Sequence, residues 1–324
     1  MKRRDFLKTS ALASGAVLLG SSCRESAEAG SAPAASADLY HVSLAQWSLH
    51  KAIFGGDLDP LDFAVVARQE FGIGGIEYVN GLFTDRRTDA EYLQALQSRA
   101  DGEGVQSLLI MCDGEGRLGD PDETARQTTI DNHRRWLDAA AFLGCHSIRV
   151  NAASEGDWDT QRDLAADGLR RLTEIAAEQN LNVIVENHGG ISSNGAWLAE
   201  VMETVDHPRC GTLPDFGNWN MGAEQGEYDP YQGLTDLMSF AKAVSFKTHR
   251  VAEDPAGPHF RFQGSNREYA EIDFVRLMRI TLDAGYRSWV GIEFEGSDVG
   301  EIEGIRRSKA ILDHIHEQLK PEYS

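Results

Sequence analysis

From residue 40 onward the chain repeats one unit eight times: a short apolar run followed by a longer amphipathic stretch. The apolar runs predict strands at 42–48, 75–80, 105–111, 146–151, 182–187, 210–215, 243–249 and 289–294. Helices are predicted between them, for example at 122–143, 160–179, 271–284 and 301–319, where apolar residues recur every three or four positions. No hairpin is predicted between consecutive strands, which favours parallel pairing throughout. The pattern therefore constrains the chain to an α/β fold.

The strands are continuously apolar, as in the NVIV run at 182–185, which is typical of strands covered on both faces. The stretch 38–324 also has the length of one barrel domain. We therefore predict a (β/α)8 TIM barrel over residues 38–324. A doubly wound open sheet is the alternative, because the sequence does not show whether the sheet closes.

Residues 1–37 resemble a targeting segment. Arg3 and Arg4 precede Phe6, Leu7 and an apolar run at 11–20, as in a twin-arginine signal. Export to the periplasm or another extracytoplasmic space is expected, with two outcomes open: cleavage after Ala37, or lipid attachment at Cys23. A basic amphipathic helix of the folded domain is the alternative. The run is shorter than the ~20 residues that cross a bilayer, so no membrane span is expected.

The net charge of the chain is −20. A surface of this sign repels the phosphate backbone of nucleic acids and anionic lipid headgroups. The charge therefore argues against a nucleic-acid partner and for a small, neutral or metal-chelated substrate.

Four of the predicted strands end in a polar residue, namely Glu186, Asp215, His249 and Glu293. In a parallel barrel the carboxyl ends of the strands converge on one mouth, where such barrels carry their chemistry. Carboxylates and an imidazole are ligands of divalent metals. The four residues are therefore predicted metal ligands, and a structural role is the alternative for His249.

Two glutamates that face each other across a bound polyol can act as an acid/base pair. One removes the proton next to a carbonyl, and the other returns a proton to the opposite face. We assign these roles to Glu186 and Glu293. Candidates for recognising hydroxyl and carbonyl groups of the substrate are polar or aromatic residues near the strand ends: Trp47, Glu77, Asn151, His188, Asn218 and Lys247.

The motifs IEYVN, WLDAAAFLGCHSIRVN, VIVENHGG, LPDFGNW, FKTHRV and DAGYRSWVGIEFEG resemble the sugar phosphate isomerase/epimerase family of xylose isomerase-like TIM barrels. The resemblance covers about residues 40–317. It implies a divalent metal, with Mn²⁺ favoured over Mg²⁺, Co²⁺ or Zn²⁺, held at Glu186, Asp215 and Glu293. Two positions depart from the family. Ser245 stands where many members have a metal-binding histidine, and Asn218 replaces a histidine of the ketose epimerases.

Together these features predict a metal-dependent isomerase or epimerase that acts on a non-phosphorylated sugar or keto-sugar. Three alternatives stay open: a lyase that uses the same enolisation on a keto-glycoside, a hydride-shift isomerase, and a non-catalytic carbohydrate-binding barrel. Assembly into a homo-oligomer also stays open.

Overall fold

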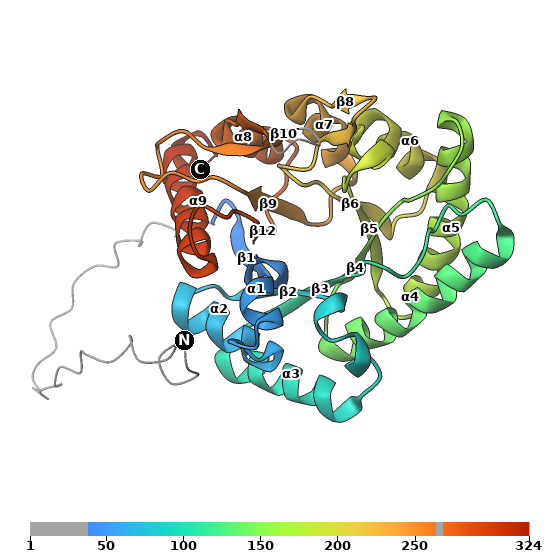
Figure 1. The fold of residues 1–324 in the computed structure, drawn as a ribbon, viewed down its shortest axis with the longest axis horizontal. Helices are drawn as coiled ribbons and strands as arrows, with labels where there is room; N and C mark the ends of the chain where they lie inside the picture. Colours follow the sequence, from blue (N-terminus) through green and yellow to red (C-terminus); the bar gives the residue numbers. More distant parts are fainter. Residues whose placement is uncertain (1–37, 264–267, 324) are drawn as a thin grey trace, which may run out of the picture.

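A computed structural model describes residues 38–263 and 268–323 of the chain (Figure 1). The predicted signal and linker at 1–37, including Cys23, lie outside the described residues, so export and lipid attachment remain predictions. Within the described part, no helix is both long enough and apolar enough to cross a membrane.

Eight parallel strands form one sheet in the order β6-β5-β4-β3-β2-β1-β12-β9. They are β1 (His41–Ala45), β2 (Gly75–Val79), β3 (Gln106–Met111), β4 (Ser147–Val150), β5 (Asn182–Glu186), β6 (Cys210–Leu213), β9 (Val244–Thr248) and β12 (Trp289–Phe294). All eight predicted strands are therefore present. The predicted strand at 42–48 ends early at Ala45, because Gln46–Leu49 turns into a 3-10 helix.

The two outer strands of this order, β6 and β9, meet and close the sheet. Lys242 N donates to Thr212 O at 3.0 Å, Ser245 N to Pro214 O at 2.9 Å, and Phe216 N to Ser245 O at 3.0 Å. Two isolated parallel bridges add to these contacts: Thr212 pairs with Ala241, and Asp215, which lies past the end of β6, pairs with Ser245. The fold is therefore a closed (β/α)8 barrel, as predicted, and not an open sheet.

Helices surround the barrel (Figure 1). They are α1 (His50–Phe54), α2 (Phe63–Phe71), α3 (Ala90–Glu103), α4 (Glu123–Leu143), α5 (Trp158–Glu178), α6 (Gly195–Val205), α7 (Pro230–Leu237), α8 (Phe274–Asp283) and α9 (Glu301–Tyr323). Most begin at a side chain that accepts hydrogen bonds from free N–H groups of the first turn, as Asp122 does for α4 and Asn194 for α6. The caps fix where each helix starts after its strand.

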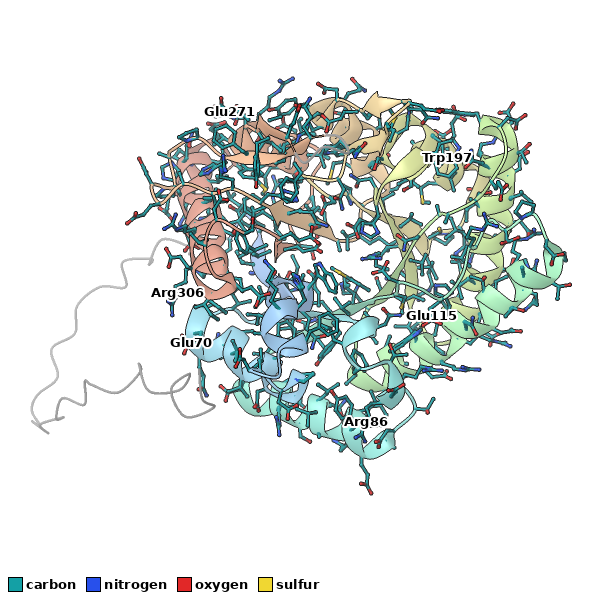
Figure 2. The ribbon with its side chains drawn as sticks, in the orientation of Figure 1. Glu70, Arg86, Glu115, Trp197, Glu271 and Arg306 are labelled. Carbon is teal, nitrogen blue, oxygen red and sulfur yellow. The ribbon has the colours of Figure 1, made fainter. Side chains whose placement is uncertain are left out.

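The last helix packs beside the first part of the helical ring. Arg306 of α9 lies next to Glu70 of α2, with 3.0 Å between Nη2 and Oε2 (Figure 2). Between helices and strands, Trp136, Trp197 and Trp219 are fully buried. The ring of helices thus closes together with the sheet and leaves the carboxyl ends of the strands as the open mouth.

Two hairpins outside the barrel were not predicted. One is formed by β7 (Asn220–Gly222) and β8 (Gly226–Glu227), the other by β10 (Phe260–Gln263) and β11 (Glu268–Glu271). The long connection at 250–270, in which no regular element was predicted, contains β10 and most of β11. These strands are only two to four residues long, too short to give a period-two signal against the background of loops.

Candidate functional site

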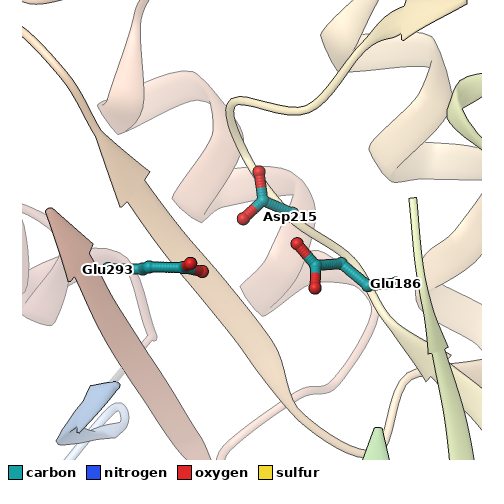
Figure 3. A group of neighbouring side chains, drawn as sticks. All are labelled: Glu186, Asp215 and Glu293. Carbon is teal, nitrogen blue, oxygen red and sulfur yellow. The ribbon is translucent and has the colours of Figure 1, made fainter. Parts of the chain in front are cut away.

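Three carboxylates converge at the mouth of the barrel (Figure 3). Glu186 is the last residue of β5, Glu293 is the second-last residue of β12, and Asp215 follows β6 by two residues. One carboxylate oxygen from each lies within 4.8 Å of the other two. All three side chains are buried, with 0–3 % of each residue exposed. The strand ends therefore bring together three of the four predicted ligands.

Asp215 is oriented by the turn that follows it. Its Oδ1 accepts hydrogen bonds from the backbone N–H groups of Gly217 at 2.7 Å and Asn218 at 2.8 Å. Ser245 Oγ donates to Asp215 Oδ2 at 2.6 Å and reaches Glu293 Oε2 at 3.3 Å. Ser245 therefore links two of the three carboxylates from strand β9.

Arg149 of β4 was not among the predicted site residues. A charged residue inside a buried strand is uncommon, and this feature could have identified it as a candidate. Its Nε lies 2.9 Å from Glu186 Oε2, in an ion pair whose angles are not those of a hydrogen bond. Its Nη1 donates to Asp113 Oδ1 at 2.7 Å. The other oxygen of Glu186 accepts from Asn218 Nδ2 at 2.9 Å. Arg149 and Asn218 thus fix the direction of the Glu186 carboxylate.

Lys247 of β9 places its ammonium among carboxylates. Nζ lies 3.4 Å from Glu293 Oε1, 3.9 Å from Glu186 Oε1 and 3.7 Å from Glu295 Oε1. Lys247 and Glu293 are register partners on adjacent strands. The side chain of Lys247 is 2 % exposed, so the ammonium is shielded from solvent.

His249 follows β9 by one residue. Its Nε2 lies 3.9 Å from Glu295 Oε2, and its ring centre is 4.1 Å from that of Phe262 in the β10–β11 hairpin. Among the described residues, the group whose ligand atoms are close enough to share one ion consists of Glu186, Asp215 and Glu293 alone. Metal ligation by His249 stays a prediction.

Three of the predicted substrate-binding residues, Trp47, Asn151 and His188, lie near Asp113 or line a cavity beside Glu293. Asn151 Nδ2 donates to Asp113 Oδ1 at 2.7 Å, and His188 Nδ1 lies 3.0 Å from Asn151 Oδ1. A cavity of about 110 Å³ opens beside Glu293. It is lined by Trp47, Val79, Met111, Asp113, Arg149, His188, Glu293 and Glu295. Trp47 and His188 therefore share a cavity with one of the predicted catalytic residues.

Glu77 of β2 lies nearer the middle of the barrel. Its Oε1 accepts from Ser43 Oγ at 2.6 Å, and its carboxyl group packs against Gly291, where a Cβ atom would approach it to 2.4 Å. Glu77 does not line the cavity beside Glu293. Burial, only partly offset by the Ser43 hydrogen bond, raises the pKa of Glu77 to about 7.

The pKa values of the three convergent carboxyl groups shift in different directions. Burial would raise the pKa of Glu186, but Arg149, His188 and Lys247 outweigh it and hold that pKa below its ordinary value. Burial raises the pKa of Asp215 to about 7, against the opposing effect of Lys247. Burial also raises the pKa of Glu293 well above its ordinary value, and Lys247 again opposes the shift. Arg149 and Lys247 therefore keep Glu186 ionised but do not offset the burial of Asp215 and Glu293, and a bound cation would favour ionisation of these two.

The donor set fits a hard divalent cation. Three oxygen donors converge, and Glu186 Oε2 has no hydrogen-bond partner among the described residues. Oxygen-only sites suit Mg²⁺ and Mn²⁺ better than softer ions. Glu186 Oε2 is held by the ion pair with Arg149 and not by a hydrogen bond, so it keeps lone pairs that could bind such an ion beside the two other carboxyls.

The fold and the site together define the class of this protein. It is a closed (β/α)8 barrel with acidic residues at the carboxyl ends of its strands. Such barrels keep their ligand site at this mouth. The chain belongs to the xylose isomerase-like TIM barrel family, which it matches over residues 65–315.

Individual relatives are distant. An inosose dehydratase of Erwinia tasmaniensis is 24 % identical over 192 residues, covering 52 % of this chain and 64 % of that protein, so the chain spans less than two thirds of the relative. The 3-keto-D-glucoside 4-epimerase YcjR of E. coli has a TM-score of 0.59 at 17 % identity, with 86 % of this chain and 99 % of YcjR covered. The IOLI protein, solved with a zinc atom, has a TM-score of 0.65 at 14 % identity over 86 % and 98 %. These two structural likenesses show the fold alone.

Proposed function

We propose that the protein is a metal-dependent isomerase or epimerase that moves a proton next to the carbonyl of a non-phosphorylated sugar or keto-sugar. The observation that carries the proposal is the convergence of Glu186, Asp215 and Glu293 in one buried group. The names of two similar proteins, a 3-keto-D-glucoside epimerase and an inosose dehydratase, support it, because a ketone acidifies the C–H bonds next to it.

Glu186, Asp215 and Glu293 would hold the ion, with His249 as a further candidate ligand. A bound divalent cation, with Mn²⁺ favoured and Mg²⁺, Co²⁺ or Zn²⁺ as alternatives, would polarise the substrate carbonyl and disperse the negative charge of the enediolate.

Glu186 removes the proton from the carbon next to the carbonyl, and Glu293 delivers a proton to the opposite face of that carbon. Arg149 and Asn218 hold the Glu186 carboxylate in position throughout. Trp47, Asn151, His188 and Lys247 bind the sugar ring and its hydroxyl groups. Asp113 and Glu295 in the cavity lining oppose the binding of a phosphate group by charge repulsion, and Arg149 in the same lining is already paired with Asp113 and Glu186.

The test is exchange of the substrate proton with solvent. With Mn²⁺ and a panel of sugars and keto-sugars in D₂O, the wild type should incorporate deuterium at the carbon next to the carbonyl. Glu186→Gln and Glu293→Gln should each lower the rate by roughly 10²–10⁴-fold, the usual contribution of a general acid or base. Turnover with retention of the substrate hydrogen would instead identify a hydride shift.

Elimination is the second candidate reaction, in a lyase that acts on keto-glycosides. It is favoured by the inosose dehydratase relative and by Asn218 and Ser245, which occupy positions where the resemblance predicts histidines. Both reactions share the first proton abstraction, so they differ only in what happens to the enediolate. Release of a free aglycone from a 3-keto-glycoside would establish the lyase, and a keto-glycoside with one inverted carbon would establish the epimerase.

The export prediction belongs to the same proposal. Residues 1–37 would direct export of the folded barrel, residues 38–324, out of the cytoplasm. Cys23 is the candidate site of lipid attachment. Cell fractionation tests it: Arg3→Lys together with Arg4→Lys should retain the protein in the cytoplasm. Export that is unaffected by the pair of substitutions would contradict the twin-arginine route.

A further inference from the structure

Lys247 is the residue whose surroundings the proposed reaction does not explain. It is a buried lysine whose ammonium lies within 4 Å of three carboxylates from two different strands and the loop after β12. Two of the three, Glu186 and Glu293, belong to the group that would hold the metal. A residue that only binds a sugar hydroxyl needs no such position between the metal-binding carboxylates.

We propose that Lys247 is a built-in counter-cation of the metal centre: its ammonium neutralises the carboxylates and thereby lowers their affinity for a divalent ion. The inference rests on the proposed metal centre and is independent of which reaction the site catalyses.

The first argument is the position of the ammonium. Nζ lies 3.4 Å from Glu293 Oε1 and 3.9 Å from Glu186 Oε1, so an ion bound by these two carboxylates becomes a near neighbour of a positive charge. Like charges repel strongly where water is excluded, because the effective dielectric constant is low. The side chain is only 2 % exposed, so solvent screens this repulsion little.

The second argument is that the lysine has little freedom to move away. Its stem packs against the backbone of Gly217, where a Cβ atom would lie 3.2 Å from Lys247 Cγ. Glu295 holds Nζ from the outer side at 3.7 Å. The ammonium therefore stays beside the carboxylates and does not extend into solvent.

The third argument concerns strand β9 itself. The first inward residue, Ser245, is neutral and donates its hydroxyl hydrogen to Asp215 at 2.6 Å. It is two residues before Lys247, on the same face of the strand. This strand therefore contributes a hydrogen-bond donor and a positive charge to the centre, and both groups compete with a cation for the carboxylate oxygens.

The experiment measures Mn²⁺ binding without substrate. Chelator-treated full-length wild type, Lys247→Gln, Lys247→Met and Lys247→Arg are titrated with Mn²⁺ by calorimetry, and thermal unfolding is recorded with and without the ion. Gln and Met remove the charge, whereas Arg keeps it. Lys242→Gln is the matched control. The ammonium of Lys242 donates to Pro208 O and contacts none of the three carboxylates.

If Lys247 is the counter-cation, Lys247→Gln and Lys247→Met should bind Mn²⁺ at least tenfold more tightly than the wild type. Both should also unfold at a lower temperature before the ion is added, since the carboxylates have then lost their neutralising partner. Lys247→Arg and Lys242→Gln should bind as the wild type does.

Equal or weaker Mn²⁺ binding by a folded Lys247→Gln would overturn the inference, and so would the absence of binding to every variant. If Lys247→Met does not fold, the comparison of Gln with Arg decides, because both retain hydrogen-bond donors to the carboxylates. Since no substrate is used, tighter binding would support the counter-cation even if the solvent-exchange test ruled out the proposed reaction.

Discussion

At the scale of single residues, the barrel interior keeps several carboxyl groups where water does not reach. Glu77 is the clearest case, because burial is the largest cause of its raised pKa, and the charge of Glu186 adds to the shift. One oxygen accepts from Ser43, and the other has no hydrogen-bond partner among the described residues. An ionised carboxylate in this position is costly, so the folded protein favours the protonated form.

This leads to a prediction about stability and pH. The pKa of Glu77 is about 7 in the folded protein and about 4.5 in the unfolded chain, so the folded state binds the proton more tightly. The resulting stabilisation is complete below pH about 4.5 and is lost as the pH rises through about 7. Its size is on the order of 3 kcal/mol for a shift of this extent. Glu77→Gln, which is always neutral, should therefore become increasingly more stable than the wild type from pH 5 to pH 8.

Chemical denaturation across this pH range measures the difference between the two proteins. Glu91→Gln, on the exposed face of α3, is the control and should follow the wild type at every pH. A constant difference between Glu77→Gln and the wild type would show that Glu77 has no raised pKa in the folded protein.

At the scale of elements, the two hairpins beside the mouth are joined by one ion pair. Arg261 of β10 donates from Nη1 and Nη2 to the two oxygens of Glu227 in β8, at 2.8 and 2.9 Å. The side chains are 6 % and 13 % exposed. Phe262, the next residue, packs on His249. The pair therefore fixes both hairpins next to the carboxylates.

Arg261→Ala should loosen both hairpins, because it removes the two-point ion pair with the Glu227 carboxylate, whose side chain is only 13 % exposed. Breaking one side of a buried pair typically costs about 3–5 kcal/mol, whereas replacing both sides with apolar residues is often neutral. Hydrogen exchange should rise in peptides that cover β7–β8 and β10–β11 but not in the barrel strands. The double variant Arg261→Met with Glu227→Met should recover most of the protection.

Arg279→Ala is the control for this prediction, since its ion pair with Glu322 is about half exposed on both sides and joins α8 to α9 away from the hairpins. If Arg261→Ala and Arg279→Ala changed exchange equally, the Arg261–Glu227 pair would not be what holds the hairpins.

The elements that the sequence predicts are those with long, continuous patterns. Eight apolar runs and the amphipathic stretches between them were enough for the barrel strands and helices, and carboxylates at strand ends were enough for Glu186, Asp215 and Glu293. Arg149 was missed because its partners, Glu186 at the end of β5 and Asp113 in the loop after β3, are distant in sequence, and no local pattern reports such a contact. The hairpins were missed because their strands are only two to four residues long, and the Arg261–Glu227 pair that joins them links positions distant in sequence.

At the scale of the whole molecule, the proposed ion would connect strands that are far apart in sequence and meet only in the folded barrel. Glu186, Asp215 and Glu293 come from β5, from the segment after β6 and from β12, and the barrel closes between β6 and β9. The unfolded chain keeps these residues up to 107 positions apart, from Glu186 to Glu293. An ion that needs all three therefore binds the folded state almost exclusively and must stabilise the whole barrel.

We accordingly expect Mn²⁺ to raise the unfolding temperature of the chelator-treated protein. At a free ion concentration 100-fold above Kd the gain is about 2.7 kcal/mol, which corresponds to a rise in Tm of roughly 5 °C for a domain of this size. Asp215→Asn should abolish the rise, because it removes one charged ligand but still offers an oxygen to the N–H groups of Gly217 and Asn218. Asp138→Asn, exposed on α4, should leave it intact. A rise that persists in Asp215→Asn would mean that the ion stabilises the barrel from another site.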